Sequence, residues 1–249
     1  MSLAKILIGL ECIGIALCII LSVAHKQEIL AFKPSFGGFA LSMLVVGVSG
    51  VIGFVLLLMA LFGPPGFIGL KALSAVLGLS PLLLIFLSIG KQGFTVPRIH
   101  NISTTPEAQL EFVHAQGLRR AGDNSLAPPS REVVEKQKLR YPELQPLAVM
   151  EVPQESFAQA IEAARHLGWQ IHYEDRDSLR FEAIDETKLF GFKDDVLVVV
   201  TSISEEEGIG NAAASLIHVR SVSRVGVSDL GANAKRIKRF YDVLKSQDE

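Results

Sequence analysis

Residues 38–62 read GFALSMLVVGVSGVIGFVLLLMALF and contain no charged side chain. A helix of about 20 apolar residues is long enough to cross the hydrocarbon core of a bilayer. Residues 6–24 and 68–89 form two further apolar runs, and the uncharged turn GPPG at 63–66 separates the second run from the third. The sequence therefore predicts three transmembrane helices, of which the last two form an antiparallel hairpin.

The rest of the 249-residue chain has a different composition. Charged residues are rare in the apolar part and frequent after it, while the whole chain has a net charge of −2 and a mean hydropathy of +0.36. We therefore expect a transmembrane region at 1–95, a proline-rich extended linker or wrapping segment at 96–146, and a soluble domain at 147–249. Within the linker, a short helical pattern lies near 131–140. The near-neutral charge argues against nucleic acid as a partner.

Hydrophobic periodicity in the soluble part predicts an α+β domain. Apolar residues recur on one face of a helix over 155–167 and in a final helix after Asp229, and alternation over 169–183 predicts a β-hairpin. Further strands are expected at 147–152, 196–203 and 215–225, and an acidic turn is expected at 205–211. The order is β-α-β-β-β-β-α, and short connections favour an antiparallel sheet with both helices on one face.

A strand that ends in two arginines and turns into a capped helix is the first candidate binding site. Helix N-termini attract anions, and neighbouring arginines add bidentate donors. The alternative is that Asp229 already occupies the helix end as its cap. The residues of this corner are Arg220, Ser223, Arg224, Ser228, Asp229 and Asn233.

Two aromatic residues around a glycine, followed by paired acids, form the second candidate at 190–195. This composition suits a protruding loop that docks on a partner or on the membrane surface, and the alternative is a polar turn that begins a strand. Two carboxylates alone are too few ligands for a hard cation, so no metal site is expected. The residues concerned are Phe190, Phe192, Lys193, Asp194 and Asp195.

The face of the sheet that points away from the helices carries the third candidate. His172, Glu182 and His218 alternate onto this face and could bind a ligand or move protons. Alternatively, the face is solvated or covered by the linker segment. The sequence contains no GxSxG, HExxH, Walker or CxxC motif, and Cys12 and Cys18 both lie in the first apolar run. We therefore expect no catalytic constellation and no cofactor.

Four separated segments resemble the DUF1499 family, a widespread domain of unknown function. They are PRIHNISTTPE at 97–107, YPELQPL at 141–147, LFGFKDDVLVVV at 189–200 and RSVSRVGVSDLGANAKRIKRF at 220–240. The resemblance covers about residues 97–246. It implies a bacterial domain that is membrane-tethered or exported, and it supplies no activity and no catalytic residue.

These observations lead to one main expectation and two alternatives. The main expectation is a non-catalytic binding or assembly module, anchored in the bacterial inner membrane with its soluble domain in the periplasm. Its partner besides the lipid bilayer would be another membrane protein, a lipid headgroup or an envelope polymer. The alternatives are a hydrolase that acts on an envelope component and an accessory subunit of a larger membrane complex. The loop charges alone would favour a cytoplasmic domain, and the resemblance outweighs them.

Overall fold

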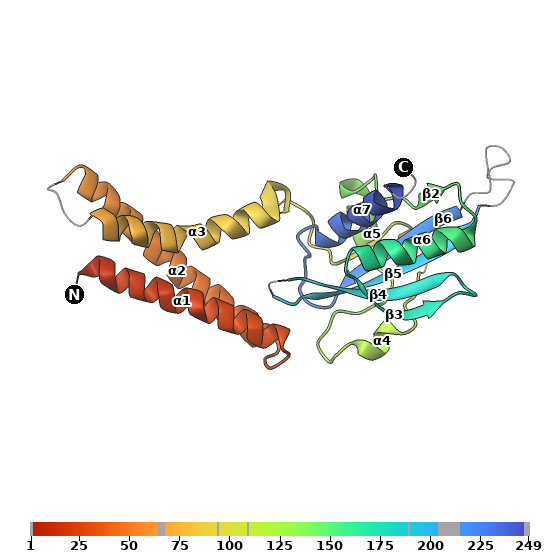
Figure 1. The fold of residues 1–249 in the computed structure, drawn as a ribbon, viewed down its shortest axis with the longest axis horizontal. Helices are drawn as coiled ribbons and strands as arrows, with labels where there is room; N and C mark the ends of the chain where they lie inside the picture. The colour runs from red at the N-terminus through yellow and green to blue at the C-terminus, as the bar shows by residue number, and fades with distance from the viewer. Residues whose placement is uncertain are drawn as a thin grey trace. The chain divides into compact units, whose positions relative to one another are not determined.

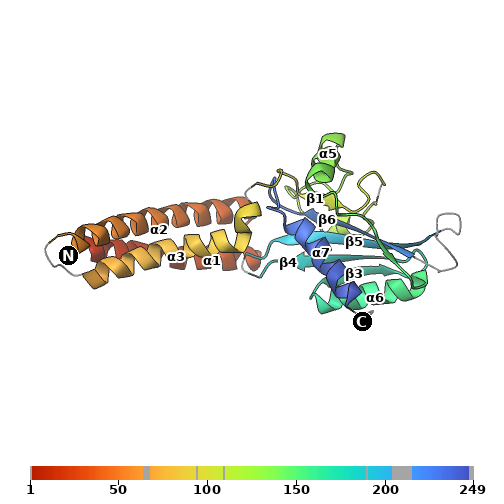
Figure 2. The ribbon, with the colours of Figure 1, turned by 90° about the horizontal axis from the view of Figure 1, so that it is seen from above.

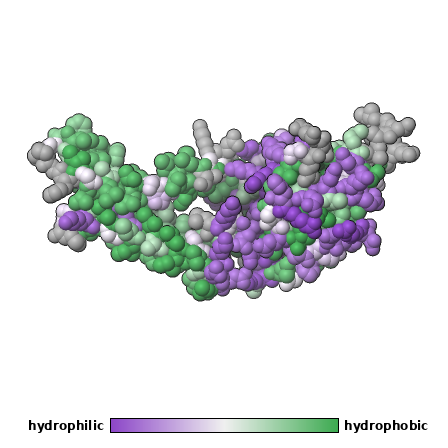
Figure 3. Space-filling model, viewed as in Figure 1, coloured by the Kyte–Doolittle hydropathy of each residue, from purple (hydrophilic) through white to green (hydrophobic). Residues whose placement is uncertain are grey.

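The computed structural model divides the chain into two compact units. One comprises Met1–Phe94 and Lys188–Gly191, and the other comprises Thr95–Thr187 and Phe192–Glu249. Figure 3 shows apolar side chains over the visible face of the first unit and mainly polar ones over that of the second. The residues described by the structure are 2–63, 68–93, 95–108, 110–188, 190–203 and 215–246.

The described residues of the first unit contain three helices (Figure 2), whose bounds are α1 Leu3–Lys26, α2 Phe32–Leu61 and α3 Ile68–Gly93. All three contain stretches long and apolar enough to cross a membrane. The expected three apolar helices are therefore confirmed, each extending beyond its apolar run by a few residues. The turns expected at 63–66 and 205–211 lie largely outside the described residues.

Small residues bring α2 and α3 into backbone contact. A Cβ atom added to Gly50 would lie 2.6 Å from the carbonyl carbon of Gly78, so neither position has room for a side chain. A polar contact joins α1 to α3, because the Ser74 hydroxyl donates to the buried carboxyl group of Glu11 over 2.7 Å. Close approach through small residues and interhelical hydrogen bonds are the typical means by which helices associate in lipid.

The second unit is an antiparallel sheet with helices, as expected (Figure 1). The strand order is β1-β6-β5-β4-β3, and β2 also pairs with β6. The bounds are β1 Asn101–Ser103, α4 Ala115–Leu118, α5 Arg131–Arg140, β2 Leu147–Val149, α6 Pro153–His166, β3 Gln170–Asp175, β4 Arg180–Glu186, β5 Lys193–Ser202, β6 Ser215–Ser223 and α7 Ala232–Lys245.

The segment at 96–146 takes part in the sheet, whereas the sequence predicted only an extended linker or wrapping segment there. Its strand β1 pairs with β6, with Ser103 opposite Arg220. The sheet therefore has six strands rather than the five of the predicted order. Three residues are too few for an alternating pattern, which explains why periodicity did not reveal β1.

Both faces of the sheet are covered. Residues from α6 and α7, including Phe157 and Ile237, pack with Val196 and Val198 in the main core (Figure 1). On the opposite face, Phe112 and Ala115 pack with Leu197 in a smaller cluster. The side chains of β5 thus alternate between two apolar layers, and the covered interpretation of the second face is the one observed.

Candidate functional site

Arg220 lies between the sheet and the covering segment, which is the part of 96–146 around residues 110–127 that packs on the second face of the sheet. Its guanidinium group donates to Asn101 Oδ1 at 3.1 Å and to the carbonyl oxygens of Leu110 at 2.6 Å, Leu126 at 2.8 Å and Ala127 at 2.8 Å. Only 2 % of the residue is exposed, and burial lowers the pKa of Arg220 to about 10. Arg220 therefore fastens the segment around 110–127 to β6 and is not available to a partner.

Arg224 and Asp195 form the second buried contact of this layer. Arg224 forms a bidentate ion pair with the Asp195 carboxylate, in which Nη2 donates to Oδ1 at 2.7 Å and Nε donates to Oδ2 at 3.0 Å. Arg119, from the covering segment, donates to the same carboxylate at 2.8 Å. Two guanidinium groups around one buried carboxylate connect β5, β6 and the covering segment, and bidentate pairs of this kind have strict geometry.

Asp194 points to the other face of the sheet, toward α7. It pairs there with Arg236, which also pairs with Asp185 at 2.6 Å. The Asn233 side chain donates to Ser223 Oγ at 2.9 Å and accepts from Ser221 Oγ at 2.7 Å. Since neighbouring strand residues face opposite ways, the two acids expected in one loop instead support two different layers.

Asp229 occupies the N-terminal end of α7. Its carboxylate accepts from the backbone N–H groups of Gly231 at 2.8 Å and Asn233 at 3.1 Å. Burial raises the pKa of Asp229, and these two hydrogen bonds oppose that change. Ser228 makes a local turn by accepting from the Leu230 N–H at 3.3 Å. The N-cap residue itself is Gly231, and Asp229, two residues earlier, accepts from the N–H groups at this helix end, so that the end is already occupied by a carboxylate as the alternative interpretation expected.

The corner expected to be a contact surface is thus largely internal. Arg220, Ser223, Arg224 and Asn233 are all buried. The sequence interpretation was wrong about their exposure. Arginine near a strand end is usually solvated, and the wrapping segment was not expected to enclose these particular arginines.

The candidate loop at 190–195 is divided between the two units. Within the helical unit, the Phe190 ring is buried, with its centroid 5.4 Å from that of Phe39. Phe192 closes a turn by donating its N–H to Thr187 Oγ1 at 2.8 Å. Lys193 is the first residue of β5, so the last three residues of the candidate belong to a strand rather than to a protruding loop.

Glu182 is buried and serves as the anchor of α4. Its carboxylate accepts from the backbone N–H groups of His114 at 3.1 Å and Ala115 at 2.7 Å, and also from that of Val113. A carboxylate at this position satisfies N–H groups that the first turn of a helix leaves without partners. Glu182 therefore has a structural explanation in this fold.

The two histidines of the third candidate do not meet. His218 on β6 bonds Thr105 at 2.7 Å and Thr201 at 3.1 Å. His172 lies on β3, and β5 and β4 intervene between the two strands. Three strand spacings alone place the two strands roughly 14 Å apart. Burial lowers the pKa of both His172 and His218, which favours neutral imidazoles.

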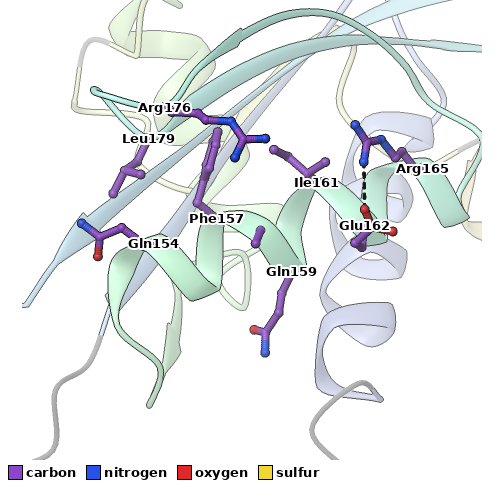
Figure 4. Close-up of a pocket in the computed structure, with 9 residues that line it drawn as sticks. Gln154, Phe157, Gln159, Ile161, Glu162, Arg165, Arg176 and Leu179 are labelled. Atoms are coloured by element: carbon purple, nitrogen blue, oxygen red, sulfur yellow. Dashed lines mark hydrogen bonds and ion pairs between the residues drawn. The ribbon is translucent and has the colours of Figure 1, made fainter.

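A hollow that sequence reasoning missed lies between α6 and the β3–β4 turn (Figure 4). Its volume is about 500 Å³, and Phe157, Ile161 and Leu179 contribute its apolar lining. Arg176 reaches across it beside Phe157, while Arg165 stands farther along α6 (Figure 4). The sequence signal was only the amphipathic pattern of 155–167, which does not distinguish core residues from the floor of a groove.

These features define an α+β domain in which buried ion pairs hold the covering elements to the sheet. In the sequence, the domain follows helices that are long and apolar enough to cross a membrane. The chain belongs to the DUF1499 family, which is described as a protein of unknown function and matches residues 101–244. The resemblance drawn from the four segments is thereby confirmed. No curated protein matches the chain.

Proposed function

We propose that the chain is a non-catalytic binding or assembly module, anchored in the bacterial inner membrane and facing the envelope. The supporting observation is how the domain uses its buried charges. Arg220, Arg224 and Asp195 fasten the covering segment to the sheet, and Asp194 and Arg236 fasten α7. Buried contacts of this kind hold the domain rigid, and a rigid domain can present a fixed surface to a partner.

The proposed location is the periplasmic side of a multi-pass inner-membrane protein. Three helices suited to spanning and an N-terminus in the cytoplasm would carry the second unit across the membrane. The partner would be another membrane protein, a lipid headgroup or an envelope polymer. Protease treatment of intact spheroplasts, with a C-terminal tag as readout, tests the location. Digestion is expected, and protection until lysis would place the domain in the cytoplasm.

Cross-linking in cells followed by purification tests the binding role. We expect the full chain to retain a defined partner that is lost when only residues 1–95 are expressed. Retention by residues 1–95 alone would instead support an accessory subunit held by its helices. The hydrolase alternative would be supported by a chain that retains no partner but degrades an envelope component. That activity should then be lost in His172→Ala or His218→Ala. The separation of His172 and His218 across the sheet weighs against that alternative.

A further inference from the structure

The covering segment is attached to the sheet at several separate points. Arg220 donates to backbone carbonyl oxygens near both ends of the segment. Between these ends, the N–H groups of 113–115 at the start of α4 donate to the Glu182 carboxylate. At the end of α4, Leu118 accepts from Arg224 Nη1 at 3.2 Å. The start of α4 therefore has its own attachment, which can open while Arg220 keeps the two ends of the segment in place.

A β-bulge places two consecutive side chains of β3 beside His114, the residue that precedes α4. Neighbouring residues of a regular strand point to opposite faces, but the pairing of β3 with β4 shifts register between Ile171 and Tyr173. Bulges re-aim side chains in this way. The ring centroids of His114 and His172 lie 5.3 Å apart, and the Tyr173 ring stacks on His114 at 5.9 Å. Two rings of β3 thus support the start of α4.

The surroundings of His172 suit a neutral imidazole. Both of its ring nitrogens are buried, and neither has a hydrogen-bond partner in the described part of the chain. Burial lowers the pKa of His172. A protonated ring would hold two N–H donors without acceptors, which is costly in a buried place. His114, in contrast, is exposed and can exchange protons with the solvent.

The charged groups around His172 already have other partners. Those that act on its charge are Glu182 on β4, Asp195 on β5, Arg224 after β6 and His114, while Arg165 of α6 lines a hollow with His172 and Glu174, Glu174 pairs with Arg176, and Arg180 on β4 donates to the Glu111 carbonyl. Asp195 is held by two guanidinium groups, whereas Glu182 is held by backbone N–H groups. Since hydrogen bonds between two ionised groups are the stronger ones, a protonated His172 gains a carboxylate most easily by drawing Glu182 away from α4.

We propose that His114 and His172 form a pH-sensitive switch, in which protonation of both imidazoles in a mildly acidic medium opens the start of α4 while Arg220 keeps the ends of the covering segment on the sheet. The two charged rings repel each other, and His172 competes with the N–H groups of α4 for Glu182. The open state takes up protons more readily than the closed one, so a fall in pH favours opening. Histidine suits this role because its ordinary pKa of about 6.5 lies near neutral pH.

Opening would uncover part of the apolar layer on the second face of the sheet. Phe112 and Ala115 pack there with Leu197. The switch would thus expose apolar side chains in response to acid. This inference concerns a change within the domain and does not depend on the proposed binding function.

Hydrogen exchange of the full chain in lipid nanodiscs tests the switch. Exchange is followed at pH 7 and at pH 5, and each rate is compared with that of an unstructured chain at the same pH, because the chemistry of exchange itself depends on pH. We expect the protection of the amides at 112–118 to fall at least tenfold from pH 7 to pH 5.

Three variants assign the effect to the histidine pair. His172→Phe keeps an aromatic ring that does not titrate, and it should reduce the loss of protection at 112–118 to less than twofold. His114→Gln should reduce that loss at least threefold. His218→Gln is the matched control, because burial lowers the pKa of His218 as well but His218 lies on β6; the loss at 112–118 should remain. The emission of Trp169, the single tryptophan, reports whether each variant is folded.

Three outcomes would overturn the proposal. The first is a loss of protection below twofold in the unchanged protein. The second is a full loss in His114→Gln, which decides the question even if His172→Phe does not fold, since His114 is exposed. The third is a loss that His218→Gln removes as completely as His172→Phe, because acid would then loosen the whole domain rather than the start of α4.

Discussion

Arg220 shows what single residues contribute to this domain. Its buried guanidinium group donates hydrogen bonds to four oxygens, one of a side-chain amide and three of backbone carbonyls. Its guanidinium carbon lies 5.3 Å from the centre of the Phe112 ring. These oxygens belong to segments that are distant in sequence from β6. One side chain therefore satisfies loop carbonyls that would otherwise be buried without partners, and such groups cost about 1–3 kcal/mol each.

Replacing Arg220 by methionine should destabilise the domain by about 2–4 kcal/mol, because the carbonyls of Leu110, Leu126 and Ala127 lose their donor. Urea unfolding followed by Trp169 fluorescence measures the change. Arg131→Met, at an exposed helix position, should change stability by less than about 0.5 kcal/mol. A stability of Arg220→Met equal to the wild type would mean that the guanidinium group is dispensable.

The Asp229 carboxylate gives a second prediction at this scale. Asp229→Ala removes the acceptor for the Gly231 and Asn233 N–H groups and should cost about 1 kcal/mol. Asp229→Asn keeps one acceptor oxygen and should recover part of that loss. The same unfolding experiment compares the two variants, and identical losses would argue against a capping role.

At the scale of elements, packing in the helical unit depends on glycines, which have no side chain to hold the helices apart. Gly50 and Gly78 let α2 and α3 touch along their backbones. The Glu11–Ser74 hydrogen bond then joins α1 to α3. Close fit of this kind is what holds membrane-spanning helices together in general, since lipid provides no hydrophobic drive between them.

Gly50→Ala should loosen the contact between α2 and α3, at a cost of about 1–3 kcal/mol, the usual range for overpacking. The Cβ atom would meet backbone, which cannot turn aside as a side chain can. Gly9→Ala on α1 is the control, because nothing lies within 4 Å of its added Cβ. Thermal unfolding of the purified chain in detergent should show a lower midpoint for the first variant only. Equal midpoints would show that the helices separate without cost.

The elements themselves differ in how well the sequence predicts them. Long periodic stretches led to α6, α7 and the β3–β4 hairpin, and α5 has the expected bounds of Arg131–Arg140. The three-residue strand β1 has too short a pattern to detect. The sequence predicts Arg220 and Arg224 at the surface, because their burial depends on a loop from a distant part of the chain. The hollow between α6 and the β3–β4 turn cannot be recognised from local sequence either, since these two elements meet only in the fold.

At the scale of the whole molecule, three partly buried histidines link the stability of the second unit to pH. Burial is the largest cause that lowers the pKa of His100, His172 and His218. The unfolded chain therefore binds more protons than the folded one below about pH 6.5. Their contribution to stability is complete above that pH and is lost as the pH falls toward the lower folded-state values.

We expect the free energy of unfolding to decrease between pH 7 and pH 5, and His218→Gln to flatten that decrease. Glutamine can still bond Thr105 and Thr201 but does not titrate in this range. Urea unfolding at a series of pH values measures the slope for both proteins. His166→Gln serves as the control, since His166 is exposed. An unchanged slope in His218→Gln would remove His218 from the linkage.

The pairing of β1 with β6 has a consequence for biosynthesis. Asn101 lies opposite Val222, so 222 − 101 = 121 positions separate the partners. A ribosome adds about 5–20 residues per second, and β1 therefore waits roughly 6–24 s for its partner strand to be made. During that time the segment that follows the helices has no sheet to join. A segment in this unfolded condition can still be threaded through a narrow translocation channel, and the late synthesis of β6 keeps this part of the chain threadable until nearly all of the domain has been made.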